Sequence, residues 1–333
     1  MIAVSALLRQ AVYPVMARAG AFARRLSSGS VAVLTYHGVI DEPVMGASPV
    51  ETGLIAAPAF RRHLRYLKSR YHLISPDLVH GWLRGDESDL PARPLLLTCD
   101  HASRRVPAAL AQLGLADDVI AQHIGWDIGA AAVTRRLAPL LDARAVLAGY
   151  SRLVIDCNRA IDDPSAIPRA SDGVVIPGNA AVDDAARQAR IAALYAPYHA
   201  RVAAELDRLG QNVAAPALVS IHSFTPQMKG FARPWHVGVL WDGDGRIALP
   251  LLAALRAEPG LVVGDNQPYS AREPVGFTQR HHGYDRGRPH VAIELRQDLI
   301  GEEPGAAQWA ERLARVLRPI LAAPGLYEAT APP

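Results

Sequence analysis

Apolar runs and helical patterns alternate along most of this chain. Six short runs rich in aliphatic and β-branched residues are typical of strands: 95–99, 145–147, 153–157, 217–222, 237–241 and 290–295. Between and after them, apolar residues recur at helical spacing in five segments: 117–123, 129–141, 183–209, 248–256 and 305–321. Strands that alternate with helices in this way predict an α/β fold.

One carboxylate interrupts the last of these strands. Residues 289–300 read PHVAIELRQDLI, in which Glu294 stands among apolar side chains. Burying an unpaired carboxylate is costly, so Glu294 is either ion-paired inside the core or chemically active. Arg296 shares the same face of the strand, as a neighbour that need not be a partner. The functional alternative is a general base beside a metal-bound water.

Three segments are expected along the chain. Residues 1–26 are apolar with four arginines and no acid, which predicts a basic amphipathic helix. Residues 27–94 form a partial α/β segment with a strand at 31–36, helices at 58–71 and 75–83, and an acidic, proline-bounded loop at 85–94. Residues 95–330 form the main domain.

Composition narrows the class of protein. Half of the 333 residues are hydrophobic and a fifth are charged, which is typical of a globular chain. A net charge of +3 without any Lys/Arg run argues against a nucleic-acid partner. Two cysteines, Cys99 and Cys157, are too few for a disulfide framework and indicate a reducing, cytoplasmic compartment. No run of 18 apolar residues occurs, so no transmembrane segment is expected.

From residue 92 to about 330 the sequence resembles the N-formylglutamate amidohydrolase family. The motifs that carry the resemblance are CDHAS (99–103), HIGWDIGA (123–130), YSRLVIDCNR (150–159), SDG (171–173), IPGN (176–179), SIHSFTP (220–226), PWHVG (234–238) and GDNQPY (264–269). The resemblance implies a three-layer α/β/α domain with a mixed sheet, akin to the zinc exopeptidases. It also implies zinc-dependent hydrolysis of N-formyl-L-glutamate, or of a related small N-acyl amino acid, to formate and glutamate.

The first 98 residues resemble a truncated polysaccharide deacetylase. The matching motifs are YHGV (36–39), YLK (66–68) and RPLLLT (93–98). That family continues into Asp-Asp-Gly, whereas Asp100 is followed here by His-Ala, and none of the twelve histidines has another three or four positions away. Carbohydrate deacetylation and an inactive hybrid protein are therefore the alternatives to the amidohydrolase. The unpaired edge of a truncated head would favour association, so an oligomer is compatible with the sequence.

Candidate metal ligands follow the predicted strands. His101 comes directly after the first strand of the main domain, and His222 ends another. Open α/β sheets place their sites at the carboxyl ends of strands. Hydrolytic zinc takes three protein ligands, commonly two histidines and a carboxylate. Asp127, at the expected start of a helix over 128–141, is the chosen carboxylate, but the same position suits an N-cap. His123 is the rival third ligand.

Candidate substrate groups lie around these ligands. Asn158 and Arg159 offer a bidentate grip on a carboxylate, although Arg159 could instead pair with a neighbouring aspartate, Asp156 or Asp162. Arg152 and Arg296 are expected to polarise the scissile carbonyl or to bind a second carboxylate. Ser223, Asn179 and His282 complete the predicted substrate-binding set, His282 from a Gly/Arg-rich loop in which a solvated histidine is the alternative.

Overall fold

The computed structural model describes residues 38–40, 54–70, 93–272 and 276–330. The chain divides into two compact units, residues 1–91 and 92–333. In the first unit, β1 (Gly38–Ile40) pairs in parallel with β2 (Leu54–Ala56), and α4 (Ala57–Arg70) confirms the helix predicted at 58–71. The predicted helix at 1–26, strand at 31–36 and helix at 75–83 lie outside the described residues.

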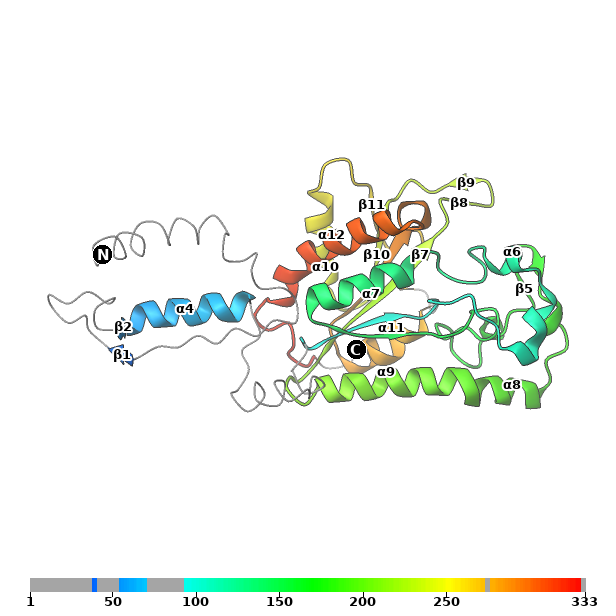
Figure 1. The fold of residues 1–333 in the computed structure, drawn as a ribbon, viewed down its shortest axis with the longest axis horizontal. Coiled ribbons are helices and arrows are strands. Elements are labelled where there is room, and N and C mark those ends of the chain that lie inside the picture. The colour runs from blue at the N-terminus through cyan, green and yellow to red at the C-terminus, as the bar shows by residue number, and fades with distance from the viewer. Residues whose placement is uncertain (1–37, 41–53, 71–92, 273–275, 331–333) are drawn as a thin grey trace, which may run out of the picture. The chain divides into compact units, whose positions relative to one another are not determined.

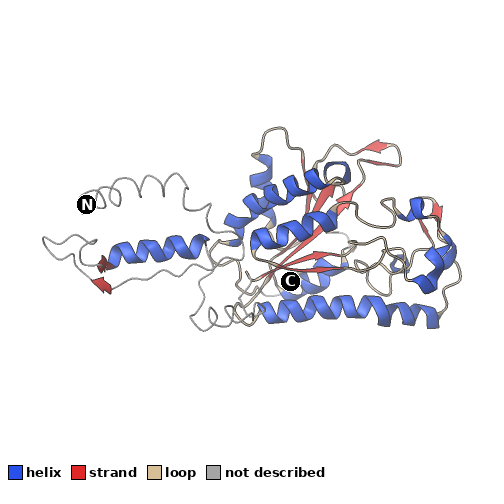
Figure 2. Ribbon diagram, viewed as in Figure 1, coloured by secondary structure: helices blue, strands red, loops and turns tan. Residues whose placement is uncertain are grey.

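The second unit contains a six-stranded mixed sheet (Figures 1 and 2). In sheet order its strands are β11 (Val263–Asp265), β10 (Val237–Leu240), β12 (His290–Arg296), β7 (Ala217–Phe224), β3 (Leu95–Cys99) and β4 (Arg144–Leu147). β12, β7, β3 and β4 are mutually parallel, and β10 runs antiparallel to β12. This confirms the predicted α/β class and mixed sheet; the likeness to zinc exopeptidases stays a prediction.

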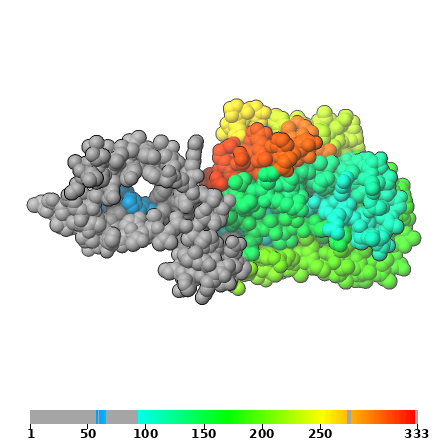
Figure 3. Space-filling view, in the orientation of Figure 1, coloured from blue at the N-terminus to red at the C-terminus, as the bar shows by residue number. Residues whose placement is uncertain are grey.

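Alternate strand residues face two different hydrophobic clusters. On β3, Leu95 and Leu97 pack in one cluster, while Leu96 packs in the other. The first cluster includes residues of α7 (Ala130–Leu141), α10 (Ala248–Arg256) and α12 (Glu303–Leu321). The second includes residues of α9 (Ala196–Leu209). Helices α7 and α12 pack side by side and form much of the surface seen in Figure 3.

Shorter elements connect these layers. They are η4 (Ala108–Gly114), α6 (Asp117–Ile120), η5 (Pro164–Ala166), β5 (Ala170–Ser171), β6 (Val174–Val175), η6 (Pro177–Asn179), α8 (Asp184–Arg190), η7 (Ile191–Tyr195), β8 (Gln227–Met228), β9 (Phe231–Ala232), α11 (Phe277–His282), η8 (Tyr284–Arg286) and η9 (Gln297–Leu299). Within the described ranges, no helix has both the length and the hydropathy that crossing a bilayer requires.

The predicted strand at 153–157 is wrong. Its residues are buried as expected but form turns. Distant side chains satisfy the backbone carbonyls that a strand neighbour would otherwise bind: Asn179 Nδ2 donates to the Leu153 oxygen at 2.8 Å, and Arg190 Nη1 donates to the Val154 oxygen at 2.9 Å. The apolar run at 153–157 therefore predicted correctly that these residues are buried, but not how their backbone groups are hydrogen-bonded.

Two further predictions differ from the structure. The helix expected at 183–209 is divided into α8, a π-helical turn at η7, and α9. Pro197, in the first turn of α9, has no N–H to donate to the preceding turn, which accounts for the irregular hydrogen bonding there. The loop expected around residue 282 is the short helix α11, and the short strand β11 was not predicted.

Candidate active site

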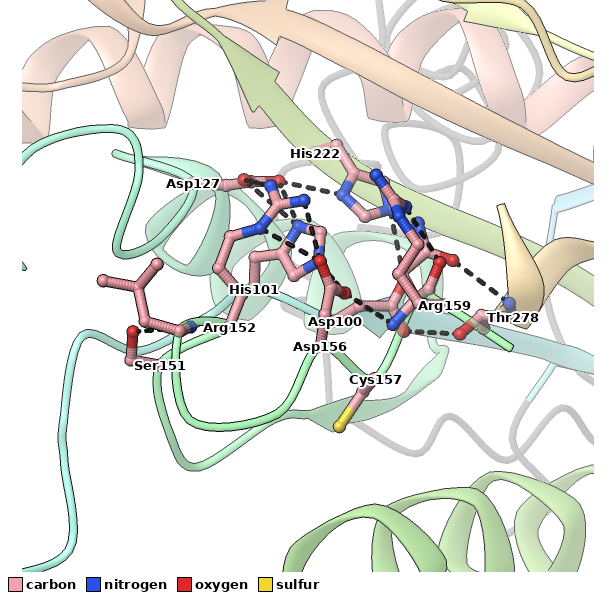
Figure 4. A network of polar contacts seen from close by, with 12 residues as sticks. Asp100, His101, Asp127, Ser151, Arg152, Asp156, Cys157, Arg159, His222 and Thr278 are labelled. Carbon is pink, nitrogen blue, oxygen red and sulfur yellow. Dashed lines mark hydrogen bonds and ion pairs between the residues drawn. The ribbon is translucent and has the colours of Figure 1, made fainter. Parts of the chain in front are cut away.

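Three buried side chains converge at the carboxyl ends of strands β3 and β7. His101 follows β3, His222 lies on β7, and Asp127 lies in the loop before α7. Their potential ligand atoms all lie within 4.8 Å of one another, so the group could hold a metal ion. Figure 4 shows both imidazoles directed toward the Asp127 carboxylate. The structure thus brings together the three residues predicted as metal ligands.

Asp127 is positioned by its loop and does not cap the helix. Its N–H donates to the His101 carbonyl at 3.0 Å, which fixes the loop beside β3. Helix α7 begins at Ala130 and its N-cap is Gly129, so the predicted helix start at 128 and the N-cap alternative for Asp127 are wrong. Gly129 has a φ of 82°, and a Cβ there would lie 2.2 Å from the Ile300 carbonyl oxygen. Asp127 Oδ2 is 2.8 Å from His222 Nδ1 and 3.3 Å from His101 Nδ1.

Each imidazole has a second carboxylate on its other nitrogen. His101 Nε2 is 2.7 Å from Asp156 Oδ1, and His222 Nε2 is 3.1 Å from Asp100 Oδ2. Carboxylate–histidine pairs of this kind orient metal-binding imidazoles and fix their tautomers. Sequence reasoning missed this role for Asp100 and Asp156. The available signal was their place beside the ligands: Asp100 directly precedes His101, and Asp156 lies within the motif at 150–159.

Asp100 is itself held by two hydroxyl donors. Tyr198 Oη donates to its Oδ1 at 2.5 Å and Thr278 Oγ1 at 2.7 Å, which links the site to α9 and α11. Burial alone would raise the pKa of Asp100, but His222 beside it lowers that pKa to about 2. Asp127 behaves likewise: burial opposes ionisation, and the two imidazoles hold its pKa well below the ordinary value. Both carboxylates are therefore ionised.

Acidic side chains surround the two imidazoles. The carboxylates of Asp100, Asp127 and Asp156 contact the two imidazoles (Figure 4), and Glu294 lies opposite His222 in the pairing of β12 with β7. Arg152 contacts two of these carboxylates, with Nη2 2.8 Å from Asp156 Oδ2 and Nη1 3.6 Å from Asp127 Oδ1. Burial lowers the pKa of Arg152, but the Asp156 and Asp127 carboxylates raise it above its usual value. Three ionised carboxylates around two buried imidazoles form a setting in which a divalent metal can bind.

Glu294 is the least satisfied carboxylate of the cluster. It is 6% exposed, and its Oε2 has no hydrogen-bond partner. No basic side chain among the described residues forms an ion pair with it, so the core salt-bridge interpretation is wrong. Burial raises the pKa of Glu294 to about 7, although His222 nearby opposes the rise. A buried carboxylate with this pKa can accept and return a proton near neutral pH.

A cavity of about 680 Å³ opens onto these groups. Eight of the predicted site residues line it: His101, Asp127, Arg152, Asn158, Arg159, His222, Ser223 and Glu294. Glu294 and His222 of the sheet line the cavity, and residues of α11 line it as well. It is therefore the place where a small substrate can meet the carboxylates and imidazoles.

Three predicted residues are not brought to this cavity. Arg296 forms a two-point ion pair with Asp298, Nε to Oδ1 at 2.8 Å and Nη2 to Oδ2 at 3.2 Å. Asn179 is buried and donates to two backbone carbonyls of the 153–168 region. His282 lies on α11 and contacts His199, with its Nε2 3.0 Å from His199 Nδ1. The structure gives all three a role in holding the fold, contrary to the roles expected for them.

The remaining candidates lie at the cavity with defined contacts. The Asn158 Oδ1 accepts from the Thr278 N–H at 3.1 Å, which ties residues 158–159 to α11. The Ser223 hydroxyl donates to the Ile128 carbonyl at 2.8 Å. His123, the rival ligand, lies on the cavity wall with Nε2 3.2 Å from Asp172, outside the metal-binding group.

Comparison with known proteins agrees with this architecture. Residues 93–301, more than half of the chain, match the model of the family described as N-formylglutamate amidohydrolase. Two N-formylglutamate deformylases, from Pseudomonas putida and Pseudomonas aeruginosa, are 27% identical over 251 residues; the alignments cover 68% of this chain and 89% and 90% of theirs. A crystal structure of a gene product of Agrobacterium tumefaciens superposes with a TM-score of 0.66 at 39% identity, covering 71% of this chain and 97% of that one. The chain therefore belongs to the N-formylglutamate amidohydrolase family.

Proposed function

We propose that this protein hydrolyses the amide C–N bond of N-formyl-L-glutamate, or of a related small N-acyl amino acid, with the help of a zinc ion. The two deformylase relatives support the substrate class. The observation that carries the proposal is the unpartnered Glu294 carboxylate beside a group of two histidines and an aspartate. A general base beside a His₂-carboxylate site is the arrangement that hydrolytic zinc enzymes use.

His101, Asp127 and His222 would hold the zinc. Two imidazoles and one carboxylate suit this metal, and Asp156 and Asp100 keep both imidazoles oriented. When bound, zinc supplies Lewis acidity, which polarises a carbonyl oxygen and lowers the pKa of a water molecule to about 7. The fit rests on the donor set and on the buried carboxylates that contact it.

Glu294 moves the proton. It accepts a proton from the attacking water as the water oxygen forms a bond to the acyl carbon. It then returns this proton to the amide nitrogen as the C–N bond breaks, so that formate and the free amine leave. A pKa of about 7 suits both halves of this exchange, because the carboxylate must gain and lose one proton in each turnover.

Asn158 and Arg159 hold the α-carboxylate of the substrate. Both line the cavity, and the contact of Asn158 with Thr278 fixes their position relative to α11. A guanidinium that binds a carboxylate by two hydrogen bonds fixes its direction as well as its place. Arg152, which is held between Asp156 and Asp127, orients those carboxylates and directs positive potential toward the acyl oxygen.

The cellular setting is also a proposal. Cys99 and Cys157 are both buried and unbonded, which supports a reducing, cytoplasmic location. A small-molecule substrate and no nucleic-acid partner are consistent with the small net charge and the enclosed site. Carbohydrate deacetylation is not favoured, because the catalytic cluster belongs to the amidohydrolase part of the chain. The resemblance of the head to polysaccharide deacetylases stays a prediction.

The direct test is formate release from N-formyl-L-glutamate by the purified full-length protein. Turnover should require one zinc ion per chain and should be lost after complete chelation and restored by added zinc. A panel of N-formyl and N-acetyl amino acids would define the acyl group and side chain. Full activity in metal-free protein, or turnover of chitooligosaccharides in place of N-acyl amino acids, would reject the proposal.

A further inference from the structure

The loop after β11 is fastened tightly to the strand beside Glu294. The Asn266 N–H donates to the Val239 carbonyl at 2.9 Å, and its side-chain Nδ2 donates to the Trp241 carbonyl at 3.0 Å. Its Oδ1 accepts from the N–H groups of Trp241 and Ala271, both at 3.1 Å. One asparagine thus ties the start of this loop to the end of β10 and holds the far end of the loop at Ala271.

The loop approaches Glu294 through a glycine. Gly238 pairs directly with Glu294 across β10 and β12. A Cβ on Gly238 would lie 1.9 Å from the Gln267 carbonyl oxygen and 3.4 Å from the Glu294 Cβ. The loop backbone therefore occupies the space that a side chain would take at the position next to Glu294. Tyr269, two residues further along, lines the same cavity as Glu294.

A buried arginine holds the Tyr269 hydroxyl. Arg233 is 8% exposed, and its Nη1 lies 3.2 Å from Tyr269 Oη; its guanidinium carbon is 4.9 Å from the centre of the Tyr269 ring. Among the described residues, the Arg233 guanidinium has no carboxylate partner; its other contacts are the Thr225 carbonyl and the Phe224 ring. A buried guanidinium without an acid is costly, which indicates that this contact has a function.

The direction of this hydrogen bond leaves the phenol hydrogen available. A guanidinium only donates, so the Tyr269 oxygen is the acceptor from Arg233. The phenol O–H must then point to another acceptor, and the structure provides none among the described residues. Tyr269 lines the cavity and is 38% exposed, so its O–H is available to water or to a bound ligand.

We propose that Tyr269 is a catalytic hydrogen-bond donor to the oxyanion that forms on the acyl oxygen during amide hydrolysis, and that Arg233 is the residue that positions it. This inference rests on the proposed function. When water adds to the acyl carbon, the carbonyl π electrons move to oxygen, and the phenol donates a hydrogen bond to that charge without losing its proton. A preorganised donor of this kind acts mainly on the transition state.

The electrostatics agree with a neutral donor. Burial raises the pKa of Tyr269, and the nearby Glu294 carboxylate raises it further, although Arg233 opposes both effects. The phenol therefore keeps its proton at neutral pH. An arginine contact also makes the phenol a stronger donor, because it draws electron density from the oxygen that carries the hydrogen.

The test is Tyr269→Phe in the full-length zinc-loaded protein, with Tyr150→Phe as the matched control because Tyr150 lies outside the cavity. We expect kcat to fall by about 10²- to 10³-fold with KM changed less than about threefold. Affinity for a phosphinate analogue of the tetrahedral intermediate should fall by a similar factor, while affinity for the product L-glutamate stays unchanged. The control should retain activity and affinity for the analogue.

Variants of Arg233 test its role in positioning Tyr269. Arg233→Met should lower kcat and affinity for the phosphinate about tenfold, Arg233→Lys should recover part of both, and neither should add to the effect of Tyr269→Phe. If the wild type is active and Tyr269→Phe is equally active, the role of Tyr269 is rejected while the proposed function stands. Equal losses of L-glutamate and phosphinate affinity would also reject it, because they would mean that Tyr269 binds a substrate carboxylate. A wild-type protein that turns over no N-acyl amino acid would overturn this inference together with the proposed function.

Discussion

Glu294 lies directly opposite His222 in the parallel pairing of β12 with β7. Paired residues on neighbouring strands project to the same face of a sheet about 4.8 Å apart at the backbone. The candidate base and one candidate metal ligand are therefore held by the hydrogen bonds of the central sheet. His101 follows the next strand, β3. The central sheet therefore holds both histidines and Glu294 in position, and only Asp127 comes from a loop.

Replacing Glu294 by Gln should abolish proton transfer while keeping the fold. The amide is nearly the same size but cannot accept the proton, so kcat should fall by about 10²- to 10⁴-fold. Zinc content and the melting temperature should stay close to those of the wild type. Glu311→Gln, at an exposed position of α12, is the matched control. Retention of more than a tenth of the activity by Glu294→Gln would mean that another group is the base.

Removing a metal ligand should remove the metal. For His101→Ala and His222→Ala we expect zinc content to fall well below one ion per chain, measured by elemental analysis after gel filtration, and activity to fall with it. His281→Gln alters a histidine outside the cavity lining and should keep one zinc ion. Stoichiometric zinc in both ligand variants would place the metal elsewhere in the protein.

Asp156 should matter through His101. Asp156→Asn weakens the contact with His101 Nε2 and the ion pair with Arg152, so metal affinity should fall by about 10- to 100-fold. Competition with a chromogenic chelator measures this. Asp298→Asn changes a half-exposed carboxylate that pairs with Arg296, and we expect it to leave the affinity unchanged. If Asp156→Asn and Asp298→Asn change the metal affinity equally, Asp156 does not support the metal site through His101.

Gly238 should not tolerate a side chain. Gly238→Ala places a methyl group 1.9 Å from the Gln267 carbonyl oxygen, so the 265–271 loop must shift or the strand must distort. We expect a loss of about 1–3 kcal/mol in the free energy of unfolding, measured by urea denaturation, together with reduced kcat. A Cβ on Gly149 would meet no atom within 4 Å, so Gly149→Ala should change stability little. A wild-type denaturation curve for Gly238→Ala would contradict the close approach of the loop.

A buried histidine pair should make the fold sensitive to acid. His199 Nε2 contacts the Cys157 carbonyl at 2.9 Å and therefore carries a proton, which leaves Nδ1 to accept from His282 Nε2. Burial lowers the pKa of His199 to about 4 and that of His282 to about 3. Both folded-state values lie below the unfolded value of about 6.5, so the unfolded chain binds more protons between these limits.

The stability linked to this pair is thus fully present above about pH 6.5 and is lost as the pH falls toward 4. We expect a loss of about 3–4 kcal/mol between pH 7 and pH 5, about half from each histidine, measured as the free energy of unfolding in urea at each pH. His282→Gln should flatten this part of the profile, whereas His63→Gln, on the exposed side of α4, should not. Parallel profiles for wild type and His282→Gln would exclude the pair as the source.

The strongest sequence patterns were those of the central sheet. The apolar runs that became β3, β7 and β12 predicted strands directly, because buried strands of an α/β sheet consist almost entirely of apolar residues. His101, His222 and Glu294 stand out at or beside such runs, where any polar residue is unusual. The helices α7, α10 and α12 were recognisable by their periodicity for a related reason, since each has one face on the core.

The sequence did not predict which partners the polar side chains contact in the folded protein. Arg296 looked like a group beside Glu294 but pairs with Asp298, two residues further along. Asn179 looked like part of a loop over the site but donates to the carbonyls of Leu153 and Pro168. In each case the residue type was compatible with several partners, and only the folded geometry selects one.

The sequence by itself determined the α/β class, the family, and the residue types available for hydrolysis, because hydrophobic period and short motifs are local properties of the chain. Tertiary structure alone decided which carboxylate meets which imidazole, that Asp127 faces His222 instead of capping α7, and that Asp100 and Asp156 orient the two histidines. Those pairings join residues up to 122 positions apart in sequence: Asp100 with His222. Their physical basis is the order and register of the strands, which no single segment of the chain encodes.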